Sequence, residues 1–119
     1  MHHYPTGDST ATATFIACQF FDNSTEGPGG AIYVWQGMIE TWGSVFLGNT
    51  AGEEGGAIRF AANGDGDLVG TLFLANSSQD DAGALHVAGS SGVAAIVNVS
   101  SCTFNQNSAV NNGGAIAMT

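Results

Sequence analysis

Hydrophobic and polar residues alternate over short stretches of this chain, and turn-forming residues separate the stretches. An apolar–variable–apolar triplet occurs four times, at residues 32–34, 58–60, 85–87 and 116–118. Alternation of this kind buries every second side chain on one face of a strand. No stretch shows a sustained 3.6-residue period with capping residues, which would mark a helix. The pattern therefore predicts an all-β protein made of short strands.

A longer repeat organises these strands. A Phe-x-x-Asn signature occurs four times, its asparagine is always followed by Ser or Thr, and a small-residue triplet begins six residues after each asparagine. The copies are spaced by 26, 27 and 31 residues, which is typical of the coils of a β-solenoid. The signature residues are Phe20, Phe46, Phe73 and Phe104 with Asn23, Asn49, Asn76 and Asn107. The middle residue of each triplet is Gly30, Gly56, Gly83 or Gly114.

Stacking of the coils gives each repeated residue a structural role. The phenylalanines are expected to stack inside the solenoid, since neighbouring coils lie about 4.8 Å apart. The asparagines are expected to form a ladder at a bend, with their amides bonded to backbone groups and to one another. The glycines supply either a turn with positive φ or a place where two backbones approach too closely for a Cβ atom.

The expected fold is a right-handed, single-stranded parallel β-helix of about four coils, because parallel crossovers are overwhelmingly right-handed. We expect one domain over residues 1–119. Neither end shows a capping element, so we expect an uncapped fragment that is able to associate end to end. The repeat units are expected at about 12–34, 38–60, 66–87 and 96–118.

Composition excludes several classes of partner. Arg59 is the only strong base among 119 residues, there is no lysine, and the formal net charge is −9. Nucleic-acid binding needs clustered Lys and Arg side chains that neutralise phosphates, so we expect no nucleic-acid partner. No run approaches the roughly 20 apolar residues of a membrane-spanning helix, so we expect no direct membrane insertion.

The FxxN and GGAI motifs, at a fixed offset over residues 12–119, resemble the chlamydial polymorphic outer-membrane protein repeat. This resemblance implies a non-enzymatic, surface-exposed β-helix of the autotransporter-passenger type. The parent protein would be extracellular or associated with the outer membrane, and would act as an adhesin toward a protein or glycan receptor or as a scaffold. The alternative is a segment of a carbohydrate-active β-helix enzyme, a polysaccharide lyase or hydrolase, whose catalytic coils lie elsewhere.

The residues themselves predict no catalytic site. Lyases of this shape use a basic residue to abstract a proton, but Arg59 stands alone and is expected on the exposed outer face. Hydrolysis requires a facing pair of carboxylates, whereas the acidic residues here are expected in turns and loops, where they are solvated.

Calcium is the one cofactor that the sequence suggests. Asn63, Asp65 and Asp67 alternate with glycines in an expected turn, a spacing found in loops that bind hard cations. Two acidic pairs also share repeat positions and are expected to stack on adjacent coils, where they repel unless exposed, screened or bridged by a cation. These pairs are Glu53-Glu54 and Asp80-Asp81. The alternative interpretation is a plain turn and a solvated acidic rim.

Cysteines and aromatic residues complete the candidates. Cys18 and Cys102 share a column but lie three coils apart, about 14 Å, so a disulfide is excluded and both are expected to be buried free thiols. Tyr33, Trp35 and Trp42 are expected to form either an exposed patch for a sugar or protein partner, or the packing of a ragged end.

Overall fold

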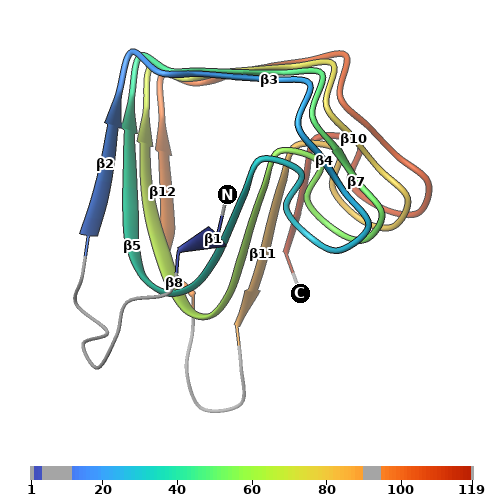
Figure 1. The fold of residues 1–119 in the computed structure, drawn as a ribbon, viewed down its shortest axis with the longest axis horizontal. Coiled ribbons are helices and arrows are strands. Elements are labelled where there is room, and N and C mark those ends of the chain that lie inside the picture. Colours follow the sequence, from blue (N-terminus) through green and yellow to red (C-terminus); the bar gives the residue numbers. More distant parts are fainter. Residues whose placement is uncertain (1, 4–11, 90–94, 119) are drawn as a thin grey trace.

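The computed structural model describes residues 2–3, 12–89 and 95–118, and every element in these ranges is a β-strand (Figure 1). No described segment forms a helix of the length and apolar character needed to cross a membrane. The strands are β1 (His2–His3), β2 (Thr12–Ile16), β3 (Gln19–Phe21), β4 (Ser24–Thr25), β5 (Ile32–Trp42), β6 (Val45–Leu47), β7 (Thr50–Ala51), β8 (Ile58–Val69), β9 (Leu72–Leu74), β10 (Ser77–Ser78), β11 (Leu85–Gly89), β12 (Val97–Ser100), β13 (Thr103–Asn105), β14 (Ser108–Ala109) and β15 (Ile116–Met118).

Strands one coil apart pair in parallel and form three sheets. The largest has the order β1-β5-β8-β11-β15, with β2 on β5 and β12 on β8. The other two have the orders β13-β9-β6-β3 and β14-β10-β7-β4. Figure 1 looks along the stack, so that equivalent strands of successive coils overlie one another. This arrangement confirms the expected parallel β-solenoid of about four turns.

The two longest strands, β5 and β8, run through a corner of the coil without a break (Figure 1). We call the part before the corner the first arm and the part after it the second arm. Val34 pairs with Phe60 and Gln36 pairs with Asn63, so β8 has one more residue at the corner than β5. This extra residue accounts for the second repeat spacing of 27 residues instead of 26.

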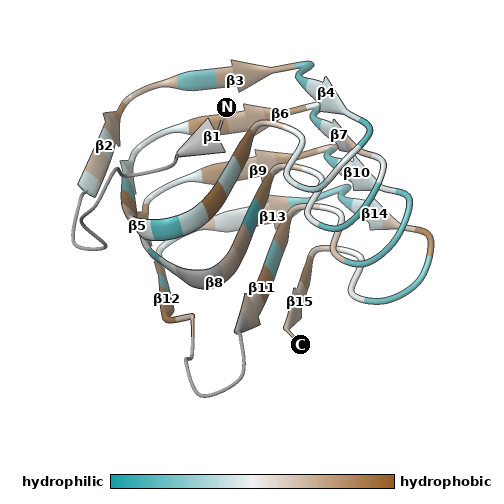
Figure 2. Cartoon of the chain, turned by 60° about the horizontal axis from the view of Figure 1, so that its bottom comes forward, coloured by the Kyte–Doolittle hydropathy of each residue, from teal (hydrophilic) through white to brown (hydrophobic). Residues whose placement is uncertain are grey.

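The core consists of columns of like side chains. The four signature phenylalanines stack with ring centroids 4.5, 5.0 and 4.7 Å apart and rings within 6° of parallel. Ile32, Ile58 and Leu85 form a second buried column. Figure 2 shows that hydrophilic residues concentrate instead in the loops after β4, β7 and β10. Hydrophobic burial is thus continuous along the solenoid axis, which is the dominant favourable term in its folding.

The signature asparagines form a ladder beside the phenylalanine stack. Asn49 and Asn76 are fully buried. The Nδ2 of Asn76 donates to the Phe46 carbonyl and to Asn107 Oδ1, each at a distance of 3.0 Å. The Oδ1 of Asn76 accepts from the backbone N–H and the Nδ2 of Asn49, each at a distance of 2.9 Å. Each buried amide is therefore satisfied by the coils on either side of it.

The small-residue triplet uses both properties of glycine, each at a different position. The first residue has positive φ in every copy, at Gly29, Gly55 and Gly113 and also at Ala82 (φ 62°). At the second residue, space is the constraint. A Cβ atom on Gly56 would lie 2.0 Å from the Gly83 carbonyl oxygen, and Gly30 and Gly83 are equally close to the next coil. At Gly114, in the last coil described, the nearest atom would be 3.5 Å away.

Loss of a ladder amide is expected to destabilise the whole solenoid. Asn76→Ala removes the side chain that bonds the Asn49 N–H, the Asn49 Nδ2 and the Phe46 carbonyl, and should lower the free energy of unfolding by about 3 kcal/mol. Chemical denaturation measures this. The matched control, Asn98→Ala on an exposed position, should change stability by less than about 0.5 kcal/mol. Equal effects of the two variants would contradict the structural role of the ladder.

Alanine substitutions are expected to distinguish the two constraints on glycine, which are close approach of the next coil and a positive φ. Gly56→Ala forces a Cβ against the backbone of the next coil and should cost about 3 kcal/mol. Gly43→Ala, which also changes glycine to alanine, meets open space at a φ of 59° and should cost about 1 kcal/mol. Thermal unfolding of both variants measures the difference. If Gly43→Ala were the more damaging, close approach of the coils would not be the limiting factor.

Candidate functional site

Side chains on the outside of the solenoid form columns whose members differ from coil to coil. One such column lies on the first arms of the largest sheet, where Tyr33 pairs with Arg59, Arg59 with His86 and His86 with Ala117. The repeat therefore fixes where these side chains lie but leaves their chemistry free to vary.

Arg59 is not the exposed, solvated residue that the sequence suggested. Only 18% of its side chain is exposed, and its Nη1 donates to Glu54 Oε2 over 2.7 Å. Its guanidinium carbon also lies 5.9 Å from the centroid of the Tyr33 ring. The prediction was wrong because the loop between β7 and β8 brings Glu54 against the outer side of the strand.

His86 is the most deeply enclosed member of this column. It is only 2% exposed, and neither ring nitrogen has a hydrogen-bond partner. Burial, and secondarily the charge of Arg59, lower its pKa from the ordinary value of 6.5, against the opposing effect of nearby carboxylates. These carboxylates belong to Glu54, Asp81 and Asp80. The imidazole is therefore neutral at pH 7.

The loop carboxylates find partners within the chain. Asp80 Oδ1 accepts from Asn111 Nδ2 over 2.6 Å. Asp81 Oδ1 accepts from the N–H and the Nδ2 of Asn112 over 3.0 and 3.1 Å. Glu54 pairs with Arg59, and Glu53 is exposed. The two acidic pairs occupy equivalent loop positions, and three of their four carboxylates accept hydrogen bonds from asparagines of the following coil or from the Arg59 guanidinium.

The expected turn around residues 63–67 is instead part of strand β8, so this sequence interpretation was wrong. Asn63, Asp65 and Asp67 occupy alternate positions of the strand. The intervening Gly66 faces the core, where a Cβ atom would lie 2.5 Å from Phe60 Cζ. The glycine is there to admit an aromatic ring, and Asp65 Oδ1 accepts the Ile96 N–H over 2.8 Å. Within the part of the chain that the structure describes, no group of three or more His, Cys, Asp or Glu residues could hold a metal ion.

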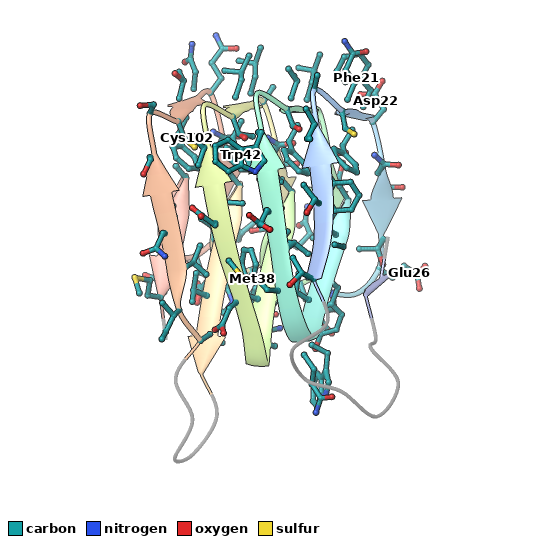
Figure 3. All side chains as sticks on the ribbon, turned by 90° about the vertical axis from the view of Figure 1, so that its left-hand side faces the viewer. Phe21, Asp22, Glu26, Met38, Trp42 and Cys102 are labelled. Atoms are coloured by element: carbon teal, nitrogen blue, oxygen red, sulfur yellow. The ribbon has the colours of Figure 1, made fainter. Side chains whose placement is uncertain are left out.

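The three candidate aromatic residues do not form a single patch. Tyr33 and Trp35 pack edge to face with centroids 6.3 Å apart, and Trp35 is 45% exposed. Trp42 is 44% exposed but lies beyond the corner of β5. Figure 3 shows Trp42 on the outer face of the second arms, with Met38 below it on the same strand.

An acidic pair on that face was missed by sequence reasoning. Glu40 in β5 and Asp67 in β8 are register partners on neighbouring parallel strands. Both are partly exposed and point away from the core, since Ile39, Thr41 and Leu68 are the buried neighbours. The signal was present, because each acid lies nine residues before the ladder asparagine of its own coil.

Both cysteines are free, as the column geometry required. They lie partly exposed in the first and last coils, while Ser44 and Thr71 fill the same column in the two middle coils and are 1% exposed. The expectation of full burial was wrong for the cysteines, because in the described structure each terminal coil is covered on only one side.

Acid is expected to weaken the fold through His86. The unfolded chain binds a proton on this residue near pH 6.5, whereas the folded chain resists it, so stability is full above that pH and declines as pH falls below it. His86→Leu should be about 1 kcal/mol more stable at pH 7.5, since it removes an unpartnered buried group, and its advantage should widen toward pH 5.5. Denaturation at both pH values tests this. If the stability advantage of His86→Leu shrank on acidification, His86 would not be the group that weakens the fold in acid.

Comparison with known proteins agrees with this architecture. The model of the Chlamydia polymorphic membrane protein repeat matches residues 17–34, 43–61 and 101–119. The coil with Phe73 and Asn76 lies between the matched segments and carries Ala82 in place of the first triplet glycine. No curated protein and no solved structure matches the chain. Three segments of the chain thus match the Chlamydia polymorphic membrane protein repeat, and the structure stacks them as coils of a β-solenoid.

Proposed function

We propose that this chain is a passenger-type segment of a cell-surface protein, in which a rigid β-solenoid holds outward side chains for adhesion to a receptor. The repeat and the fold together fit a surface, autotransporter-like passenger. The role is binding, without catalysis, and the parent protein is displayed at the outer membrane.

The observation that carries this proposal is the contrast between the inside and the outside of the coil. Inward columns repeat the same residue, as in the four stacked phenylalanines and the asparagine ladder. The outward row of Ile16, Trp42, Val69 and Ser100, which lies on the second arms and is accessible, repeats nothing. A scaffold held constant while its surface varies is the arrangement expected of a recognition protein, because solenoids present extended binding surfaces.

A fold-dependent adhesion assay tests this function. Beads coated with the chain are expected to attach to cultured epithelial cells, and soluble chain should compete with the attachment. Beads coated with the Asn49→Ala/Asn76→Ala variant, which loses the buried ladder, should attach several-fold less, because the outward side chains are no longer held in register. Circular dichroism of both proteins checks the folded state. Attachment that is equal for the two coatings, or absent for both, would contradict an adhesive role.

A further inference from the structure

The second arms of the coils form a continuous outer face of four parallel strands, β2, β5, β8 and β12 (Figure 3). We call this the second-arm face. Register partners place its outward side chains in rows that run across the strands. One row is Ile16, Trp42, Val69 and Ser100, and the next is Thr14, Glu40, Asp67 and Asn98.

The first of these rows is largely apolar and accessible. Ile16 is 70% exposed, Trp42 is 44% exposed, and Val69 between Trp42 and Ser100 is partly exposed. Scattered exposed apolar residues are normal on a protein surface, but here three lie side by side on consecutive strands. Trp42 lies between Ile16 and Val69 in this row, and an accessible tryptophan among apolar residues is typical of the residues that anchor protein interfaces.

The adjoining row carries unbalanced negative charge. Glu40 and Asp67 are directly opposite on strands about 4.8 Å apart, where like charges are unfavourable. Thr14 Oγ1 donates to Glu40 Oε1 over 3.4 Å. Among the described residues the one ion pair is that of Arg59 with Glu54, on the first arm of β8 and its preceding loop, and the chain has no other strong base. A basic group of a partner would therefore meet negative charge that no ion pair of the described residues balances.

The geometry points to an arginine-bearing segment of a partner protein as the occupant of the second-arm face. We propose that a guanidinium lies on the indole of Trp42 and pairs with the carboxylates of Glu40 and Asp67, while apolar residues of the partner cover Ile16 and Val69. Arginine fits better than lysine, because its planar guanidinium both stacks on an aromatic ring and donates to two carboxylate oxygens at once. An anionic partner would be repelled by the same row.

This inference rests on the proposed recognition function and specifies the chemistry of one partner. Complementary charge on a partner would relieve the repulsion between Glu40 and Asp67 and direct its approach. Ile96, which is 61% exposed, lies beside Asp65, whose Oδ1 accepts its N–H.

A fluorescence titration tests the inference, since the chain has only two tryptophans. In the Trp35→Phe variant of the 119-residue chain all tryptophan emission comes from Trp42. Tetra-arginine peptide is expected to shift or quench this emission, and tetra-lysine to bind at least about threefold more weakly. Glu40→Gln/Asp67→Asn should weaken tetra-arginine binding by about fivefold or more. The matched control, Glu26→Gln/Glu53→Gln, removes the same charge from exposed loop positions and should change affinity less than twofold or so.

Three results would overturn the docking face: no change in Trp42 emission with tetra-arginine, equal weakening by both double variants, or equal affinity for the lysine peptide. The bead adhesion assay, repeated with both double variants, separates this inference from the proposed function. Attachment that is unchanged in Glu40→Gln/Asp67→Asn would reject the face and keep the adhesive function. Peptide binding with the expected specificity, but no attachment of the unmodified chain to cells, would reject epithelial adhesion and keep the face.

Discussion

The structure depends on a buried amide that is satisfied only by its neighbours in the stack. Asn49 and Asn76 are fully buried, and each donates to one carbonyl of the preceding coil and to the amide oxygen of the following one. An unsatisfied buried amide costs about 1–3 kcal/mol, so a coil displaced along the axis, or rotated by one residue, would lose more than it could regain locally. The ladder therefore sets the register of every sheet at once.

Close packing of the backbone follows from this register. The carbonyl oxygen of Gly83 lies where a Cβ atom of Gly56 would stand, so the coils can reach strand spacing at the triplet only if its second residue is glycine. The phenylalanine stack needs the same spacing, because rings 4.5 to 5.0 Å apart and nearly parallel are in stacking contact. Hydrogen bonding, backbone clearance and ring stacking thus agree on one repeat distance, which is the mark of a sequence that specifies a single fold.

The features set by this repeat distance could be predicted from the sequence, and those set by loops could not. Phenylalanine, asparagine and glycine recur at fixed offsets, so their columns follow from counting residues. Burial of His86 and pairing of Arg59 depend on how loops fold against the outer side of the strands, and the loop sequences differ between coils. Glycines near Asp65 suggested a turn, yet Gly66 is required by the Phe60 ring from inside the coil. The Glu40 and Asp67 pair could have been predicted by the same count of residues, since each acid lies nine residues before the ladder asparagine of its coil.

Separation of the constant interior from the variable exterior has a physical consequence for recognition. Each outward side chain is held at strand spacing from its counterparts in the neighbouring coils, so a substitution on the outside changes the chemistry of a surface without moving its neighbours. On the second arms, Trp42, Glu40 and Asp67 lie on two directly paired strands of one sheet. On the first arms, the loop that carries Glu54 folds against the strand and occupies Arg59. The second-arm face is therefore a part of the described coil where apolar and acidic side chains are both accessible and rigidly spaced. Because these side chains are already ordered, binding of a partner costs less conformational entropy.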